Sequence, residues 1–202
     1  LLALGSKPGQ LRETVKYLVI NLVASTFFLI GLALLYRTLG TLNMADLAFK
    51  IQNSSGELDP MLTILAMVFL FVFGIKAAIF PLFFWLPGPY FQPSAGLSAF
   101  FGGILTKVGV YAIFRTFTLI FCHNPGVTHE LLLVIAALTM ILGVFGAISQ
   151  MDMKRISSYH IISQIGYMIL FTTQALAGAL FYIIHHVIVK STLFLVSGVV
   201  QM

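Results

Sequence analysis

Three lysines, Lys76, Lys107 and Lys190, lie inside stretches that are otherwise apolar enough to be membrane helices. A lysine at the centre of a membrane helix costs about 2.5 to 3.5 kcal/mol on insertion scales, so three unpaired lysines would cost on the order of 8 to 10 kcal/mol. Charged residues at this depth usually face protein or water and belong to ion pathways. The lysines therefore indicate proton or ion movement.

Lys76 precedes Pro81 by five residues, in the segment GIKAAIFPLFFWLPGP. Proline has no N–H and its ring crowds the preceding turn, so the carbonyl of Ala77 loses its helical partner and a helix break is predicted near Pro81. Secondary transporters place ion sites beside such breaks. The alternative, a lysine that reaches the membrane surface past a packing kink, is disfavoured by its distance from the nearest loop.

Lys107 shares a helical face with Gly103, Tyr111 and Arg115 in FFGGILTKVGVYAIFR. Glycine lets another helix approach closely, so we expect Lys107 to face protein, with Tyr111 as a possible supporting group. A buried structural ion pair is the alternative, but none of the six acidic residues falls at a helix centre.

The last apolar stretch, FYIIHHVIVKSTLFLVSG, places Tyr182, His186 and Lys190 on one stripe at helical spacing. Histidine titrates near neutrality, so His186 and Lys190 are predicted to form a proton relay. His185 points elsewhere; a structural role is the simpler interpretation, with relay support as the alternative.

Other polar residues at helical spacing extend this pattern, and water held between them would connect the lysines. Ordinary hydrogen bonding between helices, worth about 0.6 kcal/mol each, is the alternative. The candidates are Asn21, Ser25 and Thr26 in the first stretch, and His160, Ser163, Gln164 and Tyr167 in the fifth.

Metal and cofactor chemistry is not predicted. His160 and His186 could ligate a haem only if they faced each other, and Lys190 would be an unusual neighbour for that group. His123 and His129 are not spaced as a metal site, the single Cys122 forms no cluster, and no hydrolase motif occurs.

The elements that position these residues follow from composition. With 59% hydrophobic and 8% charged residues, the chain is unlike a soluble domain, and its scattered basic residues do not suggest nucleic-acid binding. Long apolar runs in which apolar and polar residues do not alternate indicate membrane-spanning helices rather than strands. We therefore predict an all-α polytopic membrane protein of about six spans in a single domain, residues 1–202. The runs are Thr14–Tyr36, Met61–Trp85, Ala95–Phe121, Leu131–Ser149, Ile156–Thr172 and Leu176 to the C-terminus.

Loop charges predict the orientation. One side would carry Lys7, Arg12, Lys16, Lys154 and Arg155, and the other only Arg37 and Lys50, beside the acidic residues Asp46, Glu57 and Asp59. The first side, with the N-terminal end, is therefore predicted to be cytoplasmic. Because apolar runs reach both ends of the sequence, we also expect a piece of a longer protein.

The segments GIKAAIFPLFFWLP, GGILTKVGVYAIFR, DMKRISSYHIISQIGYM and FYIIHHVIVKSTLFLVSG resemble the membrane domain of Mrp-type multisubunit sodium/proton antiporters, in particular their D subunit, and of the antiporter-like subunits of respiratory complex I. GSKPGQLRETVKYLVINLVAS and LGTLNMADL extend the resemblance over essentially the whole chain.

The resemblance implies about fourteen helices with two inverted repeats, each containing a broken helix, in a bacterial cell membrane. By this resemblance, the family's seventh-helix lysine corresponds to Lys76 and its eighth-helix lysine to Lys107. The histidine and lysine region that continues the family's central axis corresponds to His185, His186 and Lys190. The glutamate that pairs with the first lysine would lie upstream of Leu1, because Glu13 is expected in a loop, and the second broken helix would lie beyond Met202. This piece alone is therefore not expected to translocate ions.

Three functions remain open at this point. The first is proton transfer within a hetero-oligomeric cation/proton antiporter, in contact with membrane lipid, with sodium as the exchanged cation implied by resemblance alone. The second is proton pumping within an NADH:quinone oxidoreductase or membrane-bound hydrogenase. The third is a scaffold that transports nothing.

Overall fold

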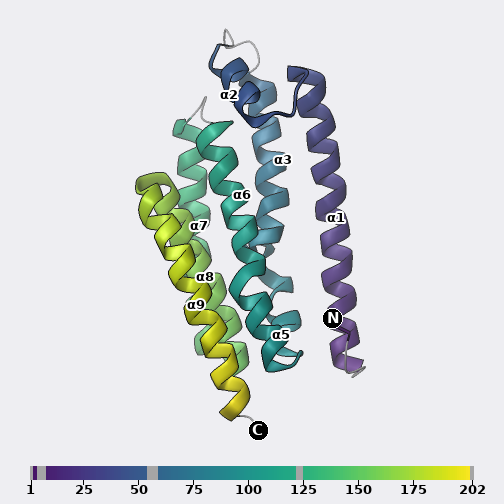
Figure 1. Cartoon of the computed structure of the whole chain (residues 1–202), viewed down its shortest axis with the longest axis vertical. Coiled ribbons are helices and arrows are strands. Elements are labelled where there is room, and N and C mark those ends of the chain that lie inside the picture. The colour runs from purple at the N-terminus through teal and green to yellow at the C-terminus, as the bar shows by residue number, and fades with distance from the viewer. Residues whose placement is uncertain (1, 4–7, 54–58, 122–124, 201–202) are drawn as a thin grey trace.

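The computed structural model describes residues 2, 3, 8–53, 59–121 and 125–200, and all regular elements in these ranges are helical (Figure 1). Lys7, Glu57, Cys122 and His123 lie outside the described residues. The elements are α1 (Pro8–Leu39), α2 (Met44–Gln52), α3 (Asp59–Ala77), the 3-10 helix η1 (Leu82–Trp85), α4 (Pro87–Phe91), α5 (Ala95–Phe100), the π-helix η2 (Phe101–Leu105), α6 (Thr106–Leu119), α7 (Pro125–Ile148), α8 (Met153–Gln174) and α9 (Leu176–Val200).

Five helical segments within the described residues are long and apolar enough to cross a membrane: Pro8–Leu39, Pro60–Trp85, Ala95–Leu119, Thr128–Ile148 and Leu176–Val200. The remaining predicted span corresponds to α8, which has 22 residues but carries His160, Ser163 and Gln164 along its length. The prediction of an all-α polytopic membrane protein is confirmed.

The first helix begins earlier than predicted, at Pro8 rather than Thr14. Proline suits the first turn of a helix because its missing N–H would have no partner there. The expectation that Glu13 lies in a loop is therefore wrong: it lies in α1 and accepts a hydrogen bond from Lys16 at 2.7 Å.

Glycines allow close helix crossings at the points where α7, α8 and α9 pack. A Cβ on Gly143 would meet the backbone of Ser163 on α8, and a Cβ on Gly146 would meet the Tyr159 ring. On the other side, a Cβ on Gly102 of η2 would meet Phe194 of α9. Small residues thus bring these helices close together, as is common between membrane helices.

The charged loop residues separate to the two ends of the bundle. The N-terminal part of α1 and the start of α8 meet at one end, where Lys16 and Arg155 line one polar pocket. At the opposite end α2 covers the bundle, and Lys50 donates a hydrogen bond to the Leu39 carbonyl (Figure 1). This is the separation predicted from the sequence; which end faces the cytoplasm stays a prediction.

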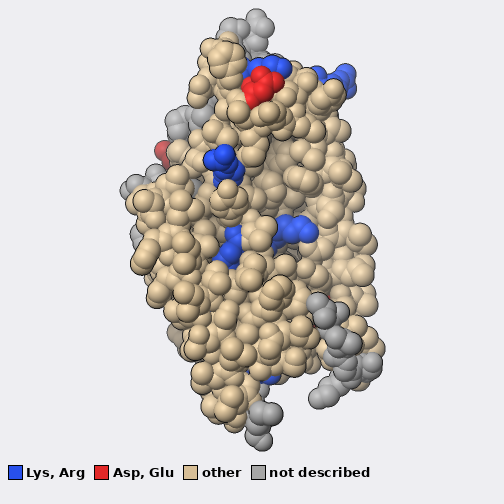
Figure 2. Space-filling view, viewed as in Figure 1, with Lys and Arg blue, Asp and Glu red and all other residues tan. Residues whose placement is uncertain are grey.

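Basic side chains are also present between the two ends. Figure 2 shows lysine and arginine atoms at mid-height on this face, whereas the acidic atoms visible there lie in the upper third.

Candidate functional site

The helix break lies directly after Lys76, so the predicted break near Pro81 is confirmed. Helix α3 ends at Ala77, and Ala78 adopts a left-handed backbone conformation with φ of 59°. The Phe80–Pro81 peptide bond is cis. The chain then resumes as η1, which leaves several backbone groups without helical partners.

These freed backbone groups find other partners inside the protein. The Ile79 amide donates to the Gly74 carbonyl at 3.1 Å, and the Phe80 amide donates to the Thr139 hydroxyl on α7 at 2.9 Å. The Trp85 indole donates to the Ile75 carbonyl at 3.0 Å. Irregular backbone is thus enclosed by protein, the condition under which a membrane protein tolerates it.

Lys76 points from the break toward α1. Its ammonium donates a hydrogen bond of 2.6 Å to the side-chain oxygen of Asn21. Both residues line a cavity of about 350 Å³, together with Tyr17, Ser25 and Trp85. The residues that line this cavity include no carboxylate, so within the described part of the chain Lys76 has only a neutral acceptor.

The helix that carries Lys107 crosses α3 immediately beside Lys76. A Cβ built on Gly109 of α6 would lie 2.5 Å from the amide nitrogen of Ala77 and 2.7 Å from the backbone carbon of Lys76. Only glycine permits this approach, which brings the α6 backbone against the end of α3.

Lys107 is buried, with 4% of its surface exposed. Its ammonium donates to the Gly102 carbonyl at 2.5 Å. Gly102 lies in η2, whose wider turn spaces backbone groups differently from an α-helix, and π-helical turns of this kind often occur at functional sites. The lysine is therefore held by a backbone carbonyl of its own helix.

His186, Lys190 and His160 form a group beside Lys107. Lys190 Nζ lies 2.5 Å from Nδ1 of His160, and His160 Nε2 lies 3.4 Å from the Gln164 amide. His186 is 3% exposed, and neither of its ring nitrogens has a hydrogen-bond partner. Lys107, Lys190 and His160 are all within electrostatic range of His186.

The structure thus brings only some of the predicted site residues together. It places Lys107, His186, Lys190 and His160 in one group, and Lys76 on the far side of the α3–α6 crossing. The predicted pairing of His186 with Lys190 does not form a hydrogen bond; Lys190 instead contacts His160, because α8 packs against α9 at that level. His185 is exposed and contacts the Tyr182 ring.

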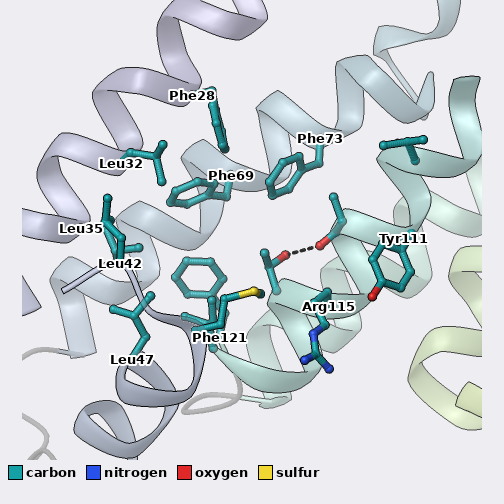
Figure 3. A pocket seen from close by; sticks show the side chains of 15 residues that line it. Phe28, Leu32, Leu35, Leu42, Leu47, Phe69, Phe73, Tyr111, Arg115 and Phe121 are labelled. Carbon is teal, nitrogen blue, oxygen red and sulfur yellow. Dashed lines mark hydrogen bonds between the residues drawn. The ribbon is translucent and has the colours of Figure 1, made fainter.

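Tyr111 does not join this group. It is 53% exposed and, with Arg115, lines a separate apolar cavity of about 320 Å³ among α1, α2, α3 and α6. Figure 3 shows both side chains along one wall of that cavity, with Leu32, Leu35 and Leu47 opposite. Tyr111 follows Lys107 by one turn of α6, but the Lys107 side chain extends back to the Gly102 carbonyl, so the two side chains do not meet.

Three polar residues at the site were not singled out from the sequence: Tyr17, Tyr90 and Thr106. Tyr17 lines the Lys76 cavity, and its ring lies 5.4 Å from that of Trp85. Tyr90 and Thr106 are buried, and their hydroxyl groups have no hydrogen-bond partner. A lone tyrosine or threonine in an apolar segment is common, so no pattern distinguished them.

The arrangement is a row of basic side chains with neutral acceptors. Within the described residues, the ion pairs Lys16–Glu13 and Lys50–Asp46 lie near the ends of the bundle, away from the buried lysines. No group of three or more His, Cys, Asp or Glu side chains in the described ranges could hold a metal ion. Such a row can accept, hold and pass protons.

The family model for the transmembrane domain of NADH:quinone oxidoreductases and Mrp antiporters matches residues 2–202. The chain belongs to this family. The resemblance inferred from the lysine-bearing segments is thereby confirmed.

Curated relatives within the family are named as the D subunit of Na⁺/H⁺ antiporters. The protein of Alkalihalophilus pseudofirmus is 56% identical over 207 residues, and that of Bacillus subtilis is 47% identical over 203 residues. These alignments cover 100% and 98% of this chain but 41% of each relative. The chain thus spans less than half the length of these relatives.

Solved structures of the family share the fold. The Mrp complex of a Dietzia species aligns with a TM-score of 0.88 at 34% identity, covering 96% of this chain and 36% of the matched chain. Respiratory complex I of Thermus thermophilus aligns with a TM-score of 0.78 at 28% identity, covering 98% of this chain and 42% of the matched chain. The antiporter-like helix arrangement is therefore common to both kinds of complex.

Proposed function

We propose that this chain, as a single domain over residues 1–202, carries the proton-transfer part of a multisubunit sodium/proton antiporter. The relatives named as D subunits of Na⁺/H⁺ antiporters support the cation/proton assignment, because the similarity covers the whole of this chain. Sodium as the exchanged ion rests on those names alone, since no cluster of carboxylates stands beside the lysines of the described ranges.

One observation carries the proposal: Lys107, His186 and Lys190 are buried beside one another, Lys190 contacts the exposed His160, and this group includes no acidic residue. A proton that arrives on one basic group repels a proton on the next, so the charged and neutral states of neighbours are coupled. Successive transfers between nitrogens, through bound water where they are not in contact, then move one proton along the row.

Lys76 is the other proton-carrying residue in this mechanism. Its cavity is lined by hydroxyl and amide groups from α1 and lies against the helix break. A carboxylate supplied by another part of the protein would stabilise the charged lysine, and its withdrawal would release the proton toward α6. This role corresponds to the family lysine that pairs with a glutamate.

The same proposal assigns the partners of this chain and its orientation in the membrane. Subunits of a hetero-oligomeric complex and membrane lipid would surround the bundle, as the match to the Mrp complex suggests. The end that carries Lys16 and Arg155 would face the cytoplasm of a bacterial cell, in agreement with the positive-inside rule.

The proposal is tested by substituting Lys76→Ala in the full-length protein, expressed with its partner subunits in an antiporter-deficient strain. We expect wild-type protein to restore growth in sodium or at alkaline pH and Lys76→Ala to lose this rescue. Lys154→Ala, which removes a lysine near the end of the bundle, is the matched control and should rescue normally. Full rescue by Lys76→Ala would contradict the role of this lysine and favour a scaffold.

A second candidate is a proton-pumping subunit of a redox complex, which the alignment with complex I favours. This alternative predicts that the full-length protein never rescues the antiporter-deficient strain. It also predicts that membranes containing the complex couple NADH oxidation to quinone reduction and that Lys76→Ala uncouples proton pumping from that reaction.

A further inference from the structure

Thr106 differs from most other threonines in the described helices. Seven threonines in the described helices donate a hydrogen bond to the carbonyl four residues earlier, as threonines in helices commonly do. They are Thr14, Thr26, Thr38, Thr116, Thr118, Thr139 and Thr192. Thr106 is completely buried, and its hydroxyl group makes no hydrogen bond.

The reason lies in the partner that Thr106 would use. The carbonyl four residues before Thr106 belongs to Gly102, and this oxygen accepts the hydrogen bond from the Lys107 ammonium. The π-helical turn of η2 and the neighbouring lysine thus leave the threonine hydroxyl unused, beside the group that holds Lys107.

A second unused hydroxyl lies close to the first. Tyr90 of α4 is 1% exposed, its ring packs 6.3 Å from both Trp85 and Phe101, and its hydroxyl group has no hydrogen-bond partner. The Thr106 side chain lies next to the Tyr90 phenol, and neither hydroxyl group makes a hydrogen bond of good geometry. Tyr17, from the Lys76 cavity, is also within electrostatic range of Tyr90.

Two neighbouring buried hydroxyl groups without well-formed hydrogen bonds are unfavourable unless something bridges them. Water is the ligand that suits such a site, because each hydroxyl can donate or accept and a buried water commonly makes two to four hydrogen bonds. A metal ion is disfavoured, since neither side chain carries a negative charge.

We propose that the hydroxyl groups of Tyr90 and Thr106 bind a buried water molecule that links the Tyr17 side of the Lys76 cavity to the Gly102 carbonyl and Lys107. The water site itself follows from the two unused hydroxyl groups; its role in transport rests on the proposed function. Tyr90 and Thr106 are then positioning residues, which hold the water through which a proton passes between α3 and α6.

The test uses the full-length protein in its complex, with sodium-dependent proton flux measured in inverted membrane vesicles. Tyr90→Phe and Thr106→Val each remove one hydroxyl and keep the shape of the side chain. We expect each to lower the rate by about tenfold, the double variant to be no slower than either single variant, and Thr106→Ser to retain most of the rate. Tyr36→Phe and Thr116→Val, at an exposed tyrosine and a threonine with a satisfied hydroxyl, should transport normally.

A purely structural role makes the opposite prediction. Removing a buried hydroxyl that has no partner takes away no hydrogen bond made by the protein, so a structural role predicts normal transport with unchanged or higher thermal stability. Our proposal expects the transport defect in complexes whose melting temperature is not lowered. A transport defect seen only together with a lowered melting temperature would overturn it.

Two outcomes separate this inference from the proposed function. If Tyr90→Phe and Thr106→Val transport at the wild-type rate while Lys107→Ala does not, the water link is wrong and the lysine relay stands. If Lys107→Ala itself transports normally, the proposed function fails. A map of the full complex that resolves other buried waters should show one between the two hydroxyl groups, and an empty space there would contradict the proposal.

Discussion

At the scale of single residues, the buried Lys107 and Lys190 and the half-buried Lys76 share one feature. The nearest acceptors of Lys76, Lys107 and Lys190 are a side-chain amide oxygen, a backbone carbonyl and an imidazole nitrogen. A neutral acceptor stabilises an ammonium group less than a carboxylate does, so the neutral amine stays accessible. Under the proposed function, these lysines exchange their protons, which a permanently paired lysine would not do.

A substitution of Asn21 tests whether the neutral hydrogen-bond acceptor matters for Lys76. Asn21→Leu removes the acceptor of the 2.6 Å hydrogen bond, and a hydrogen bond to a charged group is worth about 1.5 to 3 kcal/mol. We therefore expect sodium-dependent proton flux of the full-length complex to fall by about tenfold or more. Thr38→Val, on the same helix with its hydroxyl bonded to its own backbone, is the control; equal flux in the two variants would show that Asn21 does not serve Lys76.

At the scale of helices, two irregular elements create the site. The break after Ala77 leaves Lys76 in the last turn of α3, and the π-helical turn at Phe101–Leu105 presents the Gly102 carbonyl to Lys107. Gly109 joins the two elements, since its missing side chain lets α6 lie against the end of α3.

The substitution Gly109→Ala should therefore lower the stability of the protein. The added Cβ would lie against backbone atoms of Lys76 and Ala77, which cannot move as a flexible side chain can. We expect a loss of about 1 to 3 kcal/mol of stability, seen as a lower melting temperature of the purified complex. Gly96→Ala is the matched control, because a Cβ there meets nothing within 4 Å; equal melting temperatures would contradict the close crossing.

The sequence predicted the spans, the break and the buried lysines because apolar runs, a proline and charges inside those runs are local signals. It did not predict that Lys190 contacts His160, since that contact joins residues 30 positions apart and depends on how α8 and α9 pack. The π-helical turn was also missed, because GGILTK fits an α-helix equally well and no local signal marks the insertion.

At the scale of the whole molecule, charge is distributed in layers. Ion pairs of the described residues lie near the two ends of the bundle, and the middle contains basic groups without acidic partners. Because the chain spans 41% of its curated relatives, other helices of the full protein are available to cover the exposed polar face of α8 and to bring a carboxylate to Lys76. Under the proposed function, the row of basic groups would then be the centre of a longer proton route.

The most direct test of this account is proton flux in inverted vesicles that contain the full-length complex with Lys107→Ala, compared with wild type and Lys154→Ala at matched expression. Lys107 is the buried lysine whose ammonium bonds only a backbone carbonyl of its own helix, so its removal should leave the fold in place and interrupt the row. We predict that sodium-driven flux falls to the level of empty vesicles in Lys107→Ala and stays normal in Lys154→Ala. Wild-type flux in an assembled Lys107→Ala complex would contradict the lysine relay.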